Sequence, residues 1–151
     1  MNADALLKVT RALRQRLEQV AGIGKVFVGP LDDQDAAGAS LILFLYRIMP
    51  NASLRNREHR VPSDVPPPPV VVFSNSLPLD LHYLVTVGTT PGDDEESLLE
   101  VLGGAMQSLQ LDPDLTGPVV GHETVHLSLD PLTTEETSRM WGLFPSASYR
   151  T

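Results

Sequence analysis

The stretch that decides the fold is SLILFLYRI, which occupies residues 40–48. Apolar residues stand at both odd and even positions in it, so they fall on both faces of an extended strand. A strand that is apolar on both faces has to be covered on both. The stretch therefore predicts a central strand of a sheet that lies between two layers of other structure.

The residues before this strand predict a helix followed by a short strand. Apolar residues recur there at steps of three and four, which places them on one helix face. They are Leu6, Val9, Leu13, Leu17 and Val20. Asn2 or Asp4 can cap the start of this helix, and Gly22 ends it. Residues 25–28 are rich in valine, and we expect them to form a short strand.

Two more strands are predicted from a period of two. Apolar residues alternate with others along residues 79–87, and we expect Leu79, Leu81 and Tyr83 to lie in the core. The same alternation predicts a further strand over residues 119–129. Residues 50–69, by contrast, contain a basic segment and a run of prolines, so we expect a loop of about twenty residues there.

A second helix is predicted after the strand at residues 79–87. Asp93 or Asp94 can cap its start, and its buried residues share one face. They are Leu98, Leu102, Ala105, Met106 and Leu109. Gly103 and Gly104 weaken the middle of this helix, which suggests the close approach of another backbone or a bend.

A capping box, TTEE at residues 133–136, predicts a short third helix that ends near Phe144. We expect Trp141, the only tryptophan, to lie in the core. Together the elements predict a single domain over residues 1–151. It should combine helices and strands (α/β in the broad sense) in the α+β arrangement. Its sheet should be mixed and largely antiparallel, with helices packed on it.

Charge is unevenly distributed along the chain. The formal net charge is −8, and the absence of cysteine excludes disulfides and thiol chemistry. Residues 1–60 carry nine Lys and Arg against six Asp and Glu, whereas residues 61–151 carry two against thirteen. An acidic chain argues against nucleic-acid binding. Opposite charges in the two parts suit copies or partners that meet head to tail, while the plainer interpretation is a solvated surface with chance clustering.

The chain has neither the pattern of a signal peptide nor that of a membrane span. Charged residues interrupt its first seventeen residues. Its longest nearly uncharged apolar run, residues 39–46, is about a third of the length that a bilayer requires. We therefore expect a cytoplasmic protein that does not bind a membrane by itself.

The segment HETVH at residues 122–126 matches the zinc-protease motif H-E-x-x-H letter for letter. That motif depends on a helix, in which residues four apart share a face and can hold one metal ion. The surroundings here favour a strand, in which His122 and His126 would lie about 13 Å apart. Leu132 stands where the extended motif requires its third ligand. We therefore expect ordinary histidines, no metal and no cofactor, with a zinc hydrolase that uses His122, Glu123 and His126 as the alternative.

Several short motifs occur in an order that resembles a known family. They are NASLRN at residues 51–56, PLDLHYL at 78–84, LGGAMQSL at 102–109, and LTTEE at 132–136 with Met140 and Trp141. Their order and spacing are similar to the N-terminal domain of cap proteins from contractile injection systems of the antifeeding-prophage and virulence-cassette type. The resemblance extends over nearly the whole chain, from the first helix to Tyr149 and Arg150.

The resemblance implies a non-enzymatic tail terminator. Six copies would form a hexameric ring on the end of the inner tube, stop tube growth and tie the last sheath layer to the tube. The partners would be the inner-tube protein, the sheath protein and other copies, in a particle that the cell can release. Family members continue beyond the Tyr-Arg element with a further strand, which we expect to be absent here or supplied by a neighbour. An assembly chaperone or adaptor for the tube is a further alternative.

The candidate interface lies in and around the basic segment that precedes the prolines. It comprises Arg47, Leu54, Arg55, Asn56, Arg57 and Arg60. Arginine donates paired hydrogen bonds to carboxylates, so this segment can reach an acidic neighbour. An open sheet edge can also accept an extended strand from a partner, which is the expected means of sheath attachment.

Overall fold

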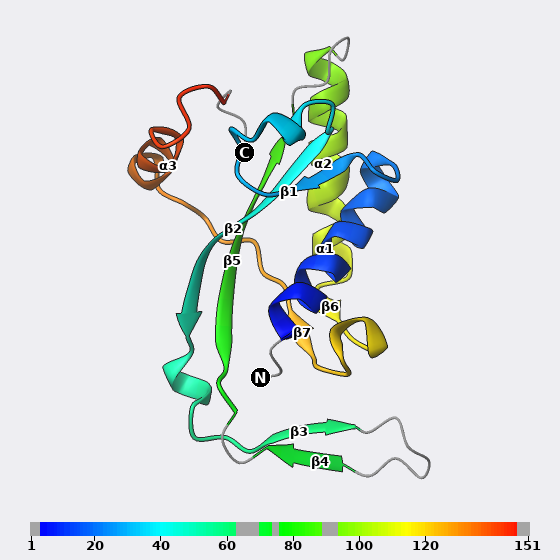
Figure 1. The fold of residues 1–151 in the computed structure, drawn as a ribbon, viewed down its shortest axis with the longest axis vertical. Coiled ribbons are helices and arrows are strands. Elements are labelled where there is room, and N and C mark those ends of the chain that lie inside the picture. The colour runs from blue at the N-terminus through cyan, green and yellow to red at the C-terminus, as the bar shows by residue number, and fades with distance from the viewer. Residues whose placement is uncertain (1–3, 63–69, 74–75, 89–93, 148–151) are drawn as a thin grey trace.

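A three-stranded mixed sheet stands at the centre of the fold, in the order β1-β2-β5 (Figure 1). Its strands are β1 (Val26–Val28), β2 (Leu41–Pro50) and β5 (Leu79–Val87). β1 runs parallel to β2, whereas β2 and β5 pair antiparallel. The α+β class and the mixed, largely antiparallel sheet predicted from the sequence are confirmed.

The computed structural model describes residues 4–62, 70–73, 76–88 and 94–147. Its helices are α1 (Ala5–Ala21), α2 (Glu95–Leu111) and α3 (Thr134–Trp141), and its short 3-10 segments are η1 (Gln34–Ala36), η2 (Ala52–Leu54) and η3 (Pro118–Val120). Two small sheets pair β3 (His59–Pro62) with β4 (Val70–Phe73), and β6 (Asp114–Leu115) with β7 (Val125–His126).

Helices α2 and α3 begin at the caps that the sequence predicts. The carboxylate of Asp94 accepts a hydrogen bond from the backbone N–H of Ser97 at 2.8 Å. Thr133 and Glu136 form the predicted capping box of α3, which ends at Trp141, earlier than expected. These caps satisfy backbone donors that have no partner inside the first helical turn.

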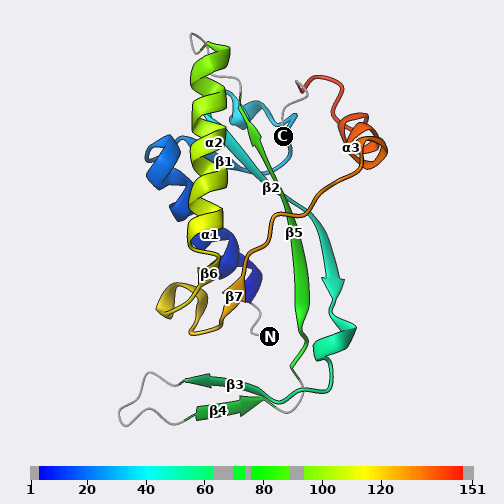
Figure 2. The same ribbon diagram turned by 180° about the vertical axis from the view of Figure 1, so that it is seen from behind.

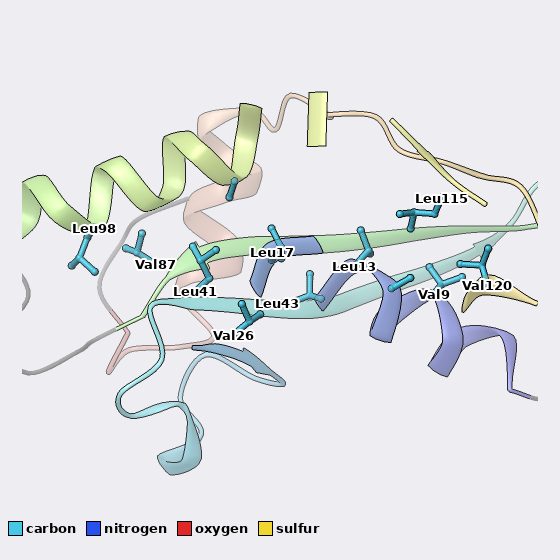
Figure 3. Packing of buried hydrophobic residues seen from close by; sticks show 12 residues of the cluster. Val9, Leu13, Leu17, Val26, Leu41, Leu43, Val87, Leu98, Leu115 and Val120 are labelled. Carbon is cyan, nitrogen blue, oxygen red and sulfur yellow. The ribbon is translucent and has the colours of Figure 1, made fainter. Parts of the chain in front are cut away.

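Helices α1 and α2 cover one face of the sheet (Figures 1 and 2). Leu13 and Leu17 of α1 lie against Leu41 and Leu43 of β2 (Figure 3), and the apolar stripe predicted for α1 is confirmed at its centre. The start of α1 differs, because Asp4 makes no capping bond with its side chain. The full cluster of buried residues is Val9, Ala12, Leu13, Leu17, Val26, Leu41, Leu43, Val87, Leu98, Ala105, Leu115 and Val120.

The opposite face of the sheet is covered by a smaller cluster around α3. Ile42 projects from β2 into this cluster together with Trp141, which is buried as expected. The rings of Phe44 and Phe144 meet edge to face with centroids 5.6 Å apart. The prediction that β2 is covered on both faces is thus confirmed for its first part, whereas its last residues, 47–50, are exposed.

Strand β5 carries the predicted apolar face. Leu81 and Tyr83 pack against the large cluster, and the Tyr83 hydroxyl lies 2.6 Å from that of Thr10 in α1. Leu79 was also expected in the core, but it is only half-buried and lies outside both clusters. The reason is its register opposite Pro50, at the end of the sheet that the helices do not reach.

The paired glycines of α2 have different surroundings. A Cβ at Gly104 would stand 2.7 Å from the Val20 side chain of α1, so a neighbouring helix does approach closely here, but with a side chain and not with the backbone that the sequence suggested. A Cβ at Gly103 would meet nothing within 4 Å. Met106, which was expected in the buried stripe, is half-exposed, because it shares with Gly103 the face that points away from α1.

The long loop that the sequence predicts over residues 50–69 is wrong for the described part, residues 50–62. Residues 52–54 form η2, and β3 pairs with β4 in an antiparallel hairpin. The strand at β3 is fixed by this distant pairing, which its own short pattern does not reveal. The proline run at residues 66–69 lies outside the described residues. Strands β2 and β5 form a ribbon that places the hairpin at the far end of the long axis (Figure 1).

The strand predicted over residues 119–129 is wrong except at Val125–His126. Gly117 and Gly121 have positive φ angles of 88° and 68°, which turn the chain on either side of η3. One apolar residue of this segment is anchored in the core without forming a strand: Val120 is buried in the large cluster beside Val9 (Figure 3).

Candidate assembly surfaces

The H-E-x-x-H segment directs its side chains to separate partners. Glu123 Oε2 lies 2.6 Å from His59 Nε2, and His126 Nδ1 lies 2.8 Å from Asp114 Oδ1. His122 has a left-handed φ of 61°. Because the segment is not helical, its histidines do not share a helix face, and the zinc-protease geometry is not formed. Within the described parts of the chain, no three His, Asp or Glu side chains are grouped to hold a metal ion.

An open cleft of about 560 Å³ separates β3 from the loop at residues 117–124. His59 from the hairpin and Glu123 from the loop meet across it, with each side chain about one-third exposed. Val61, the next apolar residue of β3, is buried. These contacts join the hairpin to the body of the domain, so we assign them a structural task.

The predicted interface residues are all exposed, and they lie along the far end of the ribbon. Arg47 is in β2, Leu54, Arg55, Asn56 and Arg57 lie in and just after η2, and Arg60 is in β3. Arg60 pairs with Glu58 at 2.8 Å, and both side chains are 66% exposed. Such an exposed pair contributes little to stability and does not withdraw Arg60 from a partner.

Asn51 organises this end of the molecule, a role that the sequence analysis missed. Its Oδ1 accepts from the backbone N–H groups of Ser53 and Leu54 at 3.0 and 3.3 Å. Its Nδ2 donates to Asp80 of β5 at 3.0 Å. One side chain therefore caps η2 and ties it to the ribbon, and an asparagine that opens a turn is the signal that could have found it.

A β-bulge selects the face on which Arg47 lies. Before the bulge Leu45 stands opposite Tyr83, and after it Arg47 stands opposite His82. Residues that stand opposite each other point to the same face, so the extra residue moves Arg47 off the apolar face that contains Tyr83. The bulge thus keeps a charged side chain away from the core.

Acidic side chains gather at the start of α2. Asp94, Glu95, Glu96 and Glu100 are all exposed, and hydrogen bonds from Ser97 hold the pKa of Asp94 below its ordinary value. Figure 1 places this start at the end of the long axis opposite the hairpin. These carboxylates form an acidic surface at one end of the molecule, and the exposed arginines near the hairpin form a basic surface at the other; the remaining charged residues of the described chain lie between them or elsewhere.

One protein-family model, described as the Pvc16 N-terminal domain, matches residues 8–151. The match takes in α1 from its fourth residue onward, α2, α3 and all the strands that the structure describes. No curated protein matches the chain. In the described parts of the chain, none of the helices combines the length and the apolarity that crossing a bilayer would need.

Proposed function

The chain belongs to the Pvc16 N-terminal domain family, which is tied to phage-tail-like contractile injection systems, and we propose that it is the tail terminator of such a particle. In this role it is a structural component rather than an enzyme. A ring of copies, six as the resemblance implies, sits on the end of the inner tube. The ring stops tube growth and links the tube to the last layer of sheath. The family match over residues 8–151 carries the proposal.

Charge separation supports a ring. A ring is built from heterologous contacts, in which one surface of a copy meets a different surface of the next. The basic surface, at the hairpin end of the molecule (the basic end), contains Arg55, Arg57 and Arg60. The acidic surface, at the opposite end, consists of the carboxylates in the first turns of α2. Surfaces of opposite charge at opposite ends favour head-to-tail association and oppose contacts between like ends.

Sheath attachment uses a different surface in this proposal. β1 and β5 form the two edges of the central sheet. An extended segment of the sheath protein can add to such an edge through main-chain hydrogen bonds. The basic end then remains for the neighbouring copy and the tube.

The first experiment removes the protein from cells that produce the particle, with imaging of the particle ends. We expect tubes of uncontrolled length with sheath that is not anchored, and restoration by the wild-type chain. The variant Arg55→Glu/Arg57→Glu should fold normally and fail to restore. Its matched control, Arg11→Glu/Arg139→Glu, changes the net charge equally on α1 and α3 and should restore. Tubes of normal length without the protein would refute the terminator role.

Stoichiometry separates a terminator from an assembly chaperone. A terminator stays on the finished particle in a fixed number of copies, whereas a chaperone leaves. Mass measurement of purified particles, with the chain labelled, makes this distinction. Particles that contain no labelled chain would contradict the proposal.

A further inference from the structure

The outer face of α2 bears an apolar surface with a gap in its middle. Leu99 and Met106 are 53% and 50% exposed, and Gly103 lies between them at helical spacing. We name these three residues the α2 face. Glycine inside a helix is destabilising relative to alanine, yet a Cβ here would meet nothing within 4 Å. The packing of the described chain gives no reason for this glycine, whose missing side chain leaves a notch between two apolar side chains.

The β3–β4 hairpin presents a second apolar surface. Arg60 stands opposite Val72, and Pro62 opposite Val70, so all four point to one side of the hairpin. Val61 and Val71 point to the other side, where Val61 is buried. We name Arg60, Val70 and Val72 the hairpin face; its two valines are 57% and 51% exposed. A two-stranded hairpin is marginal by itself and gains stability from any cover.

We propose that the α2 face of one copy receives the hairpin face of a second copy. The charges around the two faces are complementary. Glu96 and Glu100 lie on α2 beside Leu99 and Gly103, whereas Arg60 lies within the hairpin face, with Arg57 close to it in sequence. An apolar centre with a charged rim is the usual anatomy of a protein interface. The notch at Gly103 gives a valine of the hairpin room to approach the helix backbone.

The contact is heterologous, because the two faces belong to different parts of one chain (Figures 1 and 2). Each copy therefore uses its hairpin on one neighbour and its α2 on the other, which produces a closed ring or an open filament. This inference rests on the ring proposed above and names the surfaces that form it.

Cysteine cross-linking tests the contact directly, because the natural chain has no cysteine. One full-length sample has Val72→Cys and another has Met106→Cys, and both are assembled on inner tubes with a short thiol-specific cross-linker. The mixture should give covalent dimers, and each sample alone should give none. A chain with both substitutions should give a ladder that ends at the ring size. The control mixture replaces Val72→Cys with Leu129→Cys, a position with the same 51% exposure, and should not cross-link.

Imaging the tube ends in the same samples separates the two proposals. Rings without cross-links overturn the contact and leave the terminator role intact. Cross-links without rings support the contact and count against the terminator role. Dimers in either single-variant sample would show a self-complementary contact and overturn the inference. If neither rings nor cross-links form, both proposals fail.

A substitution that fills the notch gives an independent test. A Cβ at Gly103 meets nothing within 4 Å in the single chain, so we expect that the thermal unfolding temperature of Gly103→Leu does not fall. Gly103→Leu should no longer assemble on tubes. Gly103→Ala should assemble to an extent between that of Gly103→Leu and that of the wild type. The control Ser138→Leu introduces the same residue at an exposed position of α3 and should assemble normally. Normal rings from Gly103→Leu would overturn the contact.

Discussion

Separate replacement of Gly103 and Gly104 by alanine should change the stability of the folded chain in opposite directions. Alanine in place of glycine stabilises a helix interior by about 0.5–1 kcal/mol. At Gly103 nothing opposes this gain, because a Cβ meets no atom within 4 Å. At Gly104 the same Cβ would lie 2.7 Å from Val20 Cγ1, so the two helices must separate or Val20 must move. Overpacking of this kind costs about 1–3 kcal/mol, which leaves a net loss of up to about 2.5 kcal/mol.

Urea unfolding of the two variants, followed by circular dichroism, measures both effects. For a domain of this size, a change of about 1 kcal/mol shifts the melting temperature by about 2–4 °C, so a thermal scan is a second readout. Val20→Ala introduced with Gly104→Ala should recover part of the loss, because it removes the clashing methyl groups. Equal effects of the two single substitutions would refute the packing of α1 on α2 at Gly104.

Two further predictions concern a helix cap and a buried phenol. Thr133→Ala should lower the free energy of unfolding by about 1 kcal/mol, while Thr133→Ser should keep most of it, because only the hydroxyl completes the capping box. Hydrogen bonds from Thr133 hold the pKa of Glu136 below its ordinary 4.5, so the stability gained from this carboxylate is present above that pH and lost as the pH falls below it. Equal urea midpoints for the serine and alanine variants at pH 7 would contradict the cap. Burial raises the pKa of Tyr83 above its ordinary 10.0, so the resulting stability is present below pH 10 and lost as the pH rises further. Tyr83→Phe should reduce this alkaline loss in unfolding curves recorded from pH 9 to about 11, and an unchanged pH dependence would count against it.

The sequence predicted elements whose pattern is long and local. The spacing of apolar residues predicts the stripe of α1, the two-faced start of β2 and the alternation along β5. Each of these patterns repeats several times within its own element. The cap of α2 and the capping box of α3 follow from single side chains that bond within a few residues. These features need no knowledge of the rest of the chain.

The strand predicted over residues 119–129 is largely wrong because alternation of apolar residues has more than one cause. Val125 and Leu127 alternate with polar residues, and both pack against the large cluster. They do so from a short ladder and an irregular segment, since Gly121 turns the chain just before them. Apolar residues at every second position can therefore indicate side chains that pack against the core. They do not by themselves show that the backbone forms an extended strand.

The candidate surfaces were predicted only in part, for a reason of geometry. Exposed arginines in a basic segment are visible in a sequence, but the hairpin that displays Arg60 depends on pairing with β4 across the proline run. Met106 was expected in the buried stripe of α2 because helical spacing shows that residues share a broad apolar face. It does not show which residues stand at the middle of that face, against the rest of the protein. The contact of Gly104 with Val20 fixes that centre and turns Met106 and Gly103 outward.

The ribbon of β2 and β5 leaves apolar side chains exposed, and the proposed assembly offers a way to cover them. Beyond the helices, β2 and β5 continue with Ile48 and Met49 exposed, and Leu77 is exposed just before β5. This part is held by strand pairing and by the bond between Asn51 and Asp80, and none of the described helices lies behind it. Exposed apolar side chains on a protruding ribbon are a liability for a chain that acts alone, because they invite nonspecific association. In a particle component the same side chains become useful, since an adjoining subunit can bury them. The basic groups around them would then select an acidic neighbour and reject another basic end.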